Sequence, residues 1–217
     1  RLDKARVGAE GETVDGPDRK LVLVTARESA GANVSGITYG SQSLTQAVAP
    51  VGFRKTDIWY LDAPDVGTQD IVITYAANCK ARTGVMSLQN AASGDPSVSG
   101  AVQSTVSVDV TTTAANTLVL AVYNENNGGI APSSTSFTDT LMNGTGGSCD
   151  VNGGWISEAV PGLKAYSWTA DTNQCSIAYA GFVAPPPPPP TDIVLVEGSA
   201  FHYDGDSGNA TNTLSNF

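Results

Sequence analysis

The stretch Asp57-Ile-Trp-Tyr-Leu-Asp-Ala-Pro-Asp-Val-Gly-Thr-Gln-Asp-Ile-Val-Ile-Thr-Tyr75 decides the fold class. It holds two short runs of β-branched and aromatic residues, separated by turn residues that include a proline and a glycine. In the second run Ile71, Ile73 and Tyr75 alternate with other residues, so they share one face of a strand. The stretch therefore predicts two neighbouring β-strands.

The same pattern of short runs bounded by turn residues continues on both sides of this stretch. Further strands are predicted at 21–25, 34–39, 43–48, 85–88, 102–110, 116–123, 155–159, 163–169 and 176–183. The segments 124–134 and 143–154 are rich in Asn, Gly and Ser and are predicted as long loops. No segment has a helical period, and no internal repeat is visible. The pattern predicts one all-β domain, an antiparallel β-sandwich spanning 1–184.

Several of these strands also carry a resemblance to known proteins. The matching segments are Arg19-Lys-Leu-Val-Leu-Val24, Ile37-Thr-Tyr-Gly-Ser-Gln-Ser-Leu-Thr45, Asp57-Ile-Trp-Tyr-Leu-Asp-Ala-Pro-Asp-Val-Gly-Thr68, Ile71-Val-Ile-Thr74, Asn116-Thr-Leu-Val-Leu-Ala121, Ala165-Tyr-Ser-Trp-Thr169 and Ile177-Ala-Tyr-Ala-Gly-Phe182. Over residues 20–183 the chain resembles jelly-roll β-sandwich domains of large bacterial surface and secreted proteins. The resemblance implies a jelly-roll-like sandwich but no particular activity, because such domains serve as spacers, adhesive modules and filament subunits.

The run Pro185–Pro190 separates this domain from a short tail, 191–217. Six prolines predict a stiff polyproline II segment about 19 Å long, at about 3.1 Å per residue. Beyond it, Ile193, Val194, Leu195 and Val196 are apolar on both faces of a strand, which suits insertion into a sandwich. A tail of this length cannot bury a core alone. Three alternatives remain: a spacer between modules, a tail that folds back on its own sheet, or an arm that donates a strand to a neighbouring copy or repeat.

A further observation from the sequence favours the donated strand. The related jelly-roll domains begin with a strand ahead of 20–25, whereas residues 1–14 are polar and contain glycine. The segment Thr211–Phe217 is similar to that first strand. Donation from copy to copy is a head-to-tail contact that stays open-ended, which predicts a fibre and a resemblance to donor-strand-linked extracellular filament subunits.

Composition and charge exclude several classes of protein. The formal net charge is −10 and the basic residues are scattered, so no stripe of Lys and Arg follows a nucleic-acid backbone. No apolar run approaches the roughly 18 residues that span a bilayer, so no membrane insertion is expected. The chain begins at Arg1 without a leader, and we expect a processed or excised form. An acidic, Ser- and Thr-rich chain is typical of extracellular and cell-surface proteins.

Three cysteines, Cys79, Cys149 and Cys175, allow one disulfide and leave one thiol over. Cys149 and Cys175 flank the segment that contains Trp155 and Trp168, so a disulfide between these two is predicted. Three buried reduced thiols are the alternative. No Cys-x-x-Cys pair is present, and a single histidine gives too few ligands for a structural zinc site.

The tail contains the only candidates for a metal or an enzyme site. Asp204, Asp206 and Asn209 present oxygen atoms at alternating positions, as at the start of a calcium loop, but the later bidentate acid is missing, so a solvated turn competes with calcium. Ser207 lies in a Gly-Asp-Ser-Gly sequence, yet the only histidine, His202, is in the same short tail, and a catalytic triad needs groups from elsewhere in the fold. No enzyme activity and no cofactor are expected, with calcium as the open alternative.

Glycan chemistry supplies the remaining candidates. Asn33, Asn143 and Asn209 begin N-glycosylation sequences, which makes a glycoprotein a further expectation. Trp155, in a Gly- and Asn-rich segment, is a candidate for contact with a glycan, although aromatic residues at strand spacing more often belong to the core. The leading expectation is a non-enzymatic extracellular homopolymer, assembled from copies of this chain by strand donation. The alternative is a carbohydrate-binding or adhesive module of a larger secreted protein.

Overall fold

A computed structural model gives the structure of the chain and describes residues 18–28, 33–126, 132–144, 149–170 and 174–185, with the backbone of 199–202 and 213–216. The chain divides into two compact units, 1–185 and 186–217. Every regular element among the described residues is a β-strand, and every strand pairing is antiparallel, as the sequence predicts. No helix long and apolar enough to cross a membrane occurs among them.

The first unit contains strands β1 to β14. Their bounds are β1 Lys20–Arg27, β2 Val34–Tyr39, β3 Gln42–Ser43, β4 Thr45–Val48, β5 Lys55–Asp62, β6 Ile71–Tyr75, β7 Ala81–Leu88, β8 Val98–Gln103, β9 Ser107–Thr112, β10 Thr117–Glu125, β11 Asp139–Gly144, β12 Asp150–Glu158, β13 Gly162–Ser167 and β14 Ser176–Phe182.

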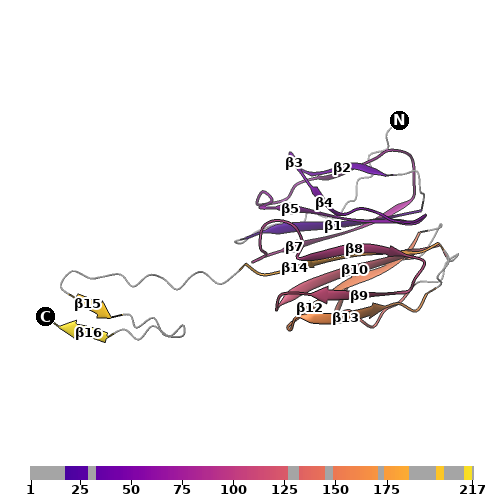
Figure 1. Ribbon diagram of the computed structural model, residues 1–217. Coiled ribbons are helices and arrows are strands. Elements are labelled where there is room, and N and C mark those ends of the chain that lie inside the picture. Colours follow the sequence, from indigo (N-terminus) through magenta and orange to yellow (C-terminus); the bar gives the residue numbers. More distant parts are fainter. Residues whose placement is uncertain are drawn as a thin grey trace. The chain divides into compact units, whose positions relative to one another are not determined.

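These strands form four sheets that stack in layers (Figure 1). The first inner sheet has the order β4-β5-β1-β7, and the second inner sheet has the order β11-β12-β10-β14-β8. A first outer sheet, β3-β2-β6, covers the first inner sheet, and a second outer sheet, β13-β9, covers the second. The single sandwich that the sequence predicts is thus extended by one further layer on each side.

Three apolar clusters fill the spaces between the layers. The central core lies between the inner sheets and includes Val22 and Val24 of β1 with Leu120 and Val122 of β10. The first outer core joins the opposite face of β1 to β2 and β6, and the second outer core joins the opposite face of β10 to β9 and β13. Because both faces of β1 and β10 are buried, the middle of each strand, Leu21–Val24 and Leu118–Val122, is a continuous apolar run rather than an alternating one.

The two halves of the first unit repeat one arrangement of strands. The order β4-β5-β1-β7 corresponds to β11-β12-β10-β14. Along the chain, the outer strand β6 lies between β5 and β7, and the outer strand β13 lies between the corresponding inner strands β12 and β14. One row across the first inner sheet runs Val48, Ile58, Val24, Gly84; the corresponding row across the second runs Met142, Gly153, Val122, Ala178. In both halves a bulge in the edge strand lies immediately before the first residue of that row.

The structure corrects the sequence prediction in two regions of this unit. The segment 102–110, predicted as one strand, is split between β8 in an inner sheet and β9 in an outer sheet, with Ser104 between them at a φ of 57°. The predicted loop 143–154 contains the end of β11 and the first half of β12, including Gly153 and Gly154. These two glycines lie where neighbouring strands come too close for a side chain.

In the second unit, the residues that the structure describes form an antiparallel pair, β15 (Ser199–His202) with β16 (Thr213–Asn216). The C-terminal segment that the sequence likens to a first strand of the sandwich thus includes a strand paired within its own unit. Residues 186–198, with the proline run and the predicted donor residues Ile193 to Val196, lie outside the described residues.

Candidate functional site

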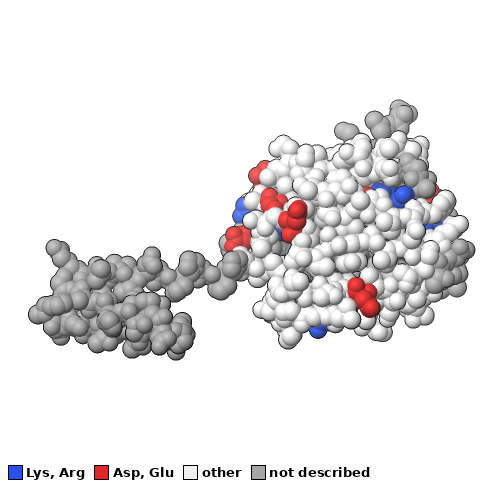
Figure 2. Space-filling model, in the orientation of Figure 1, with Lys and Arg blue, Asp and Glu red and all other residues white. Residues whose placement is uncertain are grey.

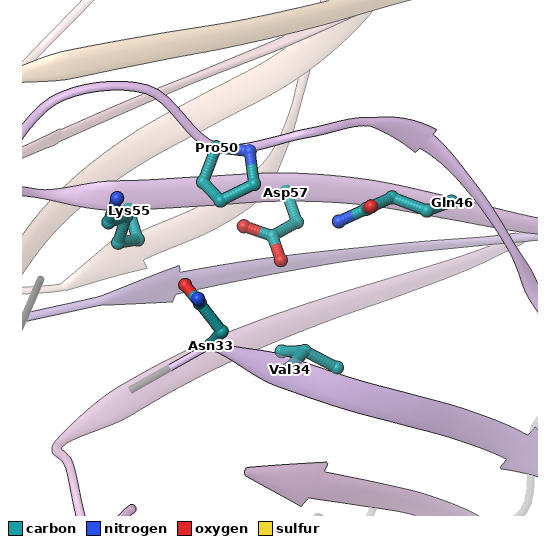
Figure 3. Close-up of a pocket in the computed structure, with 6 residues that line it drawn as sticks. All are labelled: Asn33, Val34, Gln46, Pro50, Lys55 and Asp57. Carbon is teal, nitrogen blue, oxygen red and sulfur yellow. The ribbon is translucent and has the colours of Figure 1, made fainter. Parts of the chain in front are cut away.

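A polar hollow of about 300 Å³ lies beside the first inner sheet. Its lining comes from the start of β2, from β4, from the loop before β5 and from β5 itself: Asn33, Val34, Gln46, Pro50, Lys55 and Asp57. Figure 3 shows the polar ends of Asn33, Gln46 and Asp57 converging on a common space. Amide, ammonium and carboxylate groups together offer several hydrogen-bond donors and acceptors to a polar ligand.

One of the lining residues, Asp57, belongs to a buried ion pair. Arg27 donates from Nη1 to Oδ2 of Asp57 at 2.9 Å and from Nη2 to Oδ1 at 2.8 Å. Both side chains are almost fully buried, with 0% and 1% exposed. Burial raises the pKa of the Asp57 carboxyl, while the Arg27 guanidinium opposes that shift. Because Arg27 engages both carboxylate oxygens, the pair is suited to holding β1 and β5 in register, and not to proton transfer.

Polar side chains next to this pair connect the two inner sheets. Asn124 on β10 donates from Nδ2 to the carbonyl oxygens of Arg27 and Lys55, at 3.0 and 3.2 Å. The hydroxyl oxygens of Thr56 on β5 and Ser176 on β14 lie 3.0 Å apart. These hydrogen bonds cross the central core at one end, so they fix how one half of the unit sits on the other.

A buried lysine holds the opposite end of β1. Nζ of Lys20 lies 2.7 Å from Oδ1 of Asp62, donates to the Gly94 carbonyl oxygen at 2.7 Å, and stands 4.5 Å from the centre of the Tyr60 ring. Tyr60 in turn donates to Oδ1 of Asp95 at 2.6 Å, and this hydrogen bond, together with burial, raises the pKa of Tyr60 to about 12. The contacts tie the segment between β7 and β8 to the first half of the unit.

The three cysteines are free thiols, so the disulfide predicted between Cys149 and Cys175 does not form in the structure. Cys149 belongs to the central core and Cys175 to the second outer core, on opposite faces of the second inner sheet. A disulfide needs side chains that point toward one another, which opposite faces exclude. Burial raises the pKa of the Cys149 thiol to about 11, so it stays protonated and unreactive at neutral pH. Cys79 is partly buried, and its pKa is also raised by burial.

The remaining predicted residues fall at separate places. Asn33 and Asn143 are exposed, as a glycosylation acceptor must be, and Asn33 also lines the polar hollow. Trp155 on β12 is half-buried and packs against the central core, away from the hollow. The candidate calcium ligands Asp204, Asp206 and Asn209 lie outside the described residues, and the described ones contain no group of three acidic, cysteine or histidine side chains placed to hold a metal ion.

Sequence reasoning did not identify Lys20, Arg27 and Asp57 as buried polar residues. A signal was present, because Lys20 and Arg27 flank the segment Leu21–Ala26, which is apolar except for Thr25. Charges at both ends of a strand that is buried on both faces must be paired or exposed. The partner of each charge, however, lies on a different strand and follows only from the register of β1 against β5.

Comparison with known proteins adds no relative. No protein family, no curated protein and no solved structure matches this chain.

Proposed function

We propose that this protein is a non-enzymatic structural subunit of an extracellular filament or surface array, in which each copy donates a strand to the next. The observation that carries the proposal is the division of the chain at the proline run. A layered β-unit ends at Pro185, and a second, small unit begins at Pro186. The segment between that boundary and β15 contains the apolar run Ile193–Val196.

The buried polar groups of the first unit support a structural role. Two ion pairs of the described residues, Arg27 with Asp57 and Lys20 with Asp62, join neighbouring strands of one sheet. Residues that perturb one another's pKa at a catalytic site usually lie in a cleft with one member left free to react. Here the paired groups connect strands, which is the behaviour expected of a scaffold.

The surface of the first unit also supports assembly of copies. Figure 2 shows a face on which few charged side chains lie among a large majority of other residues. The centres of protein–protein interfaces are depleted in charged residues. In this proposal the proline run is the linker and Ile193, Val194, Leu195 and Val196 form the donated strand, as the resemblance to jelly-roll domains and donor-strand filament subunits implies.

Removing the tail tests the proposal. Deleting residues 191–217 is expected to leave a folded monomer and to abolish filaments or arrays, as judged by negative-stain microscopy and size-exclusion chromatography. The matched control is the conservative pair Ile193→Val with Leu195→Ile, which keeps the apolar faces and is expected to keep assembly. Filaments that persist after the deletion contradict the proposal.

A second candidate, a carbohydrate-binding or adhesive module, is favoured by the polar hollow beside Asp57. Side-chain amides of the kind that Asn33 and Gln46 present both donate and accept hydrogen bonds, as sugar hydroxyl groups require. Trp155, the glycan contact expected from the sequence, belongs to the central core and does not line this hollow.

A glycan array tests this second function. Replacing Asn33 and Gln46 together by alanine is expected to reduce binding of any recognised glycan by about fivefold or more, on the basis of one lost hydrogen bond from each side chain. Each lost hydrogen bond removes about 0.5 to 1.5 kcal/mol. Gln69→Ala, on an exposed residue that does not line the hollow, is the control. Absence of binding by the unchanged protein to every glycan of the array rejects this candidate.

A further inference from the structure

The pair formed by Lys20 and Asp62 differs from an ordinary ion pair. Lys20 begins β1, Asp62 ends β5, and the register of the two strands places these residues directly opposite each other. Nζ of Lys20 lies 2.7 Å from Oδ1 of Asp62, and the lysine side chain is 1% exposed. Yet this oxygen is buried and accepts no hydrogen bond among the described residues. The two groups are therefore in close contact without the geometry of a hydrogen bond.

Aromatic rings keep water away from the lysine nitrogen. Nζ of Lys20 stands 4.5 Å from the centre of the Tyr60 ring and 5.6 Å from the centre of the Phe182 ring. The Asp62 side chain as a whole is 32% exposed, but the oxygen that faces the lysine is buried. Charges are costly to hold where water is excluded, and transfer of a proton from Nζ to Oδ1 replaces two charges by two neutral groups. An amine that has lost this proton is a nucleophile.

The backbone of Gly94 holds both groups of the pair. Its carbonyl oxygen accepts a hydrogen bond from Nζ of Lys20 at 2.7 Å, and its N–H donates to Oδ2 of Asp62, also at 2.7 Å. The φ of Gly94 is 92°, in the left-handed region that favours glycine. A backbone N–H in this position stabilises the negative charge that develops on Oδ2 when a nucleophile adds to the carboxyl carbon, as in an oxyanion hole.

We propose that Lys20 and Asp62 form an intramolecular amide bond, which is an isopeptide cross-link between β1 and β5. A proton passes from Nζ to Oδ1, and the lone pair of Nζ then attacks Cγ. The Cγ–Oδ1 bond breaks, and this oxygen leaves as water with a second proton from the nitrogen. Oδ2, held by the Gly94 N–H, becomes the amide oxygen. The carboxyl carbon is bonded to Oδ1, so the nitrogen is at most one C–O bond further from the carbon than from that oxygen.

The cross-link would act within one copy of the protein, so it goes beyond the proposed strand donation and does not depend on it. β1 is paired on one side with β5 and on the other with β7. A covalent bond at the Lys20 end of the β1–β5 pair closes a loop of the chain from 20 to 62, which restricts the unfolded state as other cross-links do. The two strands could then no longer separate at that end.

Intact-mass spectrometry of the full chain, denatured under reducing conditions, tests the bond. The expected mass is that of the sequence less one water molecule. After digestion with trypsin, segment 20–27 is expected to be joined to segment 56–80, with tandem spectra that place the link between Lys20 and Asp62.

Two arginine variants are matched for this experiment. Lys20→Arg keeps the positive charge, but a guanidinium does not condense with a carboxyl group, so the full mass of its sequence is expected. Lys164→Arg changes the lysine of the more exposed pair with Glu158 and is expected to keep the loss of water.

Several outcomes overturn the proposal. A mass equal to that of the sequence, unchanged after prolonged incubation of the folded protein, shows that no bond forms. A loss of water that persists in Lys20→Arg comes from another group. If Lys20→Arg does not fold, the joined tryptic segments of the unchanged protein decide, and their absence rejects the cross-link. None of these results depends on whether the chain assembles, so the cross-link and the filament are tested separately.

Discussion

Replacing Asp57 with alanine is expected to lower the free energy of unfolding by about 3 to 5 kcal/mol, because the Arg27 guanidinium would remain buried without its counter-charge. That loss is a large part of the about 5 to 15 kcal/mol that stabilises a typical domain. Urea denaturation followed by tryptophan fluorescence measures it.

Two controls separate charge burial from simple truncation. Lys164→Ala breaks the ion pair between Lys164 and Glu158, in which the lysine side chain is 32% exposed. This change is expected to lower the free energy of unfolding by under about 1 kcal/mol. The double variant Arg27→Met with Asp57→Leu removes both charges and is expected to recover most of the stability, since apolar residues can replace a buried pair. A loss for Asp57→Ala no larger than that for Lys164→Ala contradicts the role given to the pair.

Gly154→Ala is the second substitution for which a large effect is expected. A Cβ at this position of β12 would overlap the backbone carbonyl oxygen of Asp139 on β11 and would lie 3.0 Å from Cβ of Phe137. Backbone atoms cannot turn aside as a side chain can, so β11 must separate from β12. We expect a loss of about 1 to 3 kcal/mol or more from overpacking, measured by thermal unfolding.

Gly36→Ala is the matched control for this substitution. Gly36 also lies in a strand, β2, but no atom stands within 4 Å of the place that a Cβ would take, and its φ is outside the left-handed region. Alanine restricts the unfolded chain more than glycine does, so stability is expected to stay the same or to rise by up to about 1 kcal/mol. Equal losses at Gly36 and Gly154 would show that strand glycines matter here for a reason other than close packing.

The sequence predicted strands correctly where the burial of one or both faces leaves an alternating or continuous run of apolar residues. β1, β5, β6 and β10 are apolar or alternating runs bounded by turn residues, and each was predicted within a few residues of its observed bounds. The first half of β12 was missed because Asn152, Gly153 and Gly154 have the composition of a loop. Their place in a central strand depends on the close approach of β10 and β11, which the local sequence does not contain.

The internal correspondence of the halves was missed for a related reason. Matched positions carry different residue types, such as Ile58 against Gly153 and Gly84 against Ala178. Strand order and register keep the two rows in place, while large and small side chains exchange positions between the rows within the one central core. The candidate site could likewise be predicted only in part. The sequence places Asp57 at the start of a predicted strand, but its pairing with Arg27 depends on the register of β1 against β5.

The place of β14 determines how the protein would respond to a pulling force. The chain leaves the first unit just beyond Phe182, at the end of a strand that is hydrogen-bonded along its length to β10 on one side and β8 on the other. A force applied at Pro185 along the axis of β14 shears both ladders at once, and their hydrogen bonds must break together rather than one after another. Resistance to such a force depends on the rate of unfolding. The two hydrogen-bond ladders of β14 are therefore expected to act as a mechanical clamp where the chain leaves the first unit.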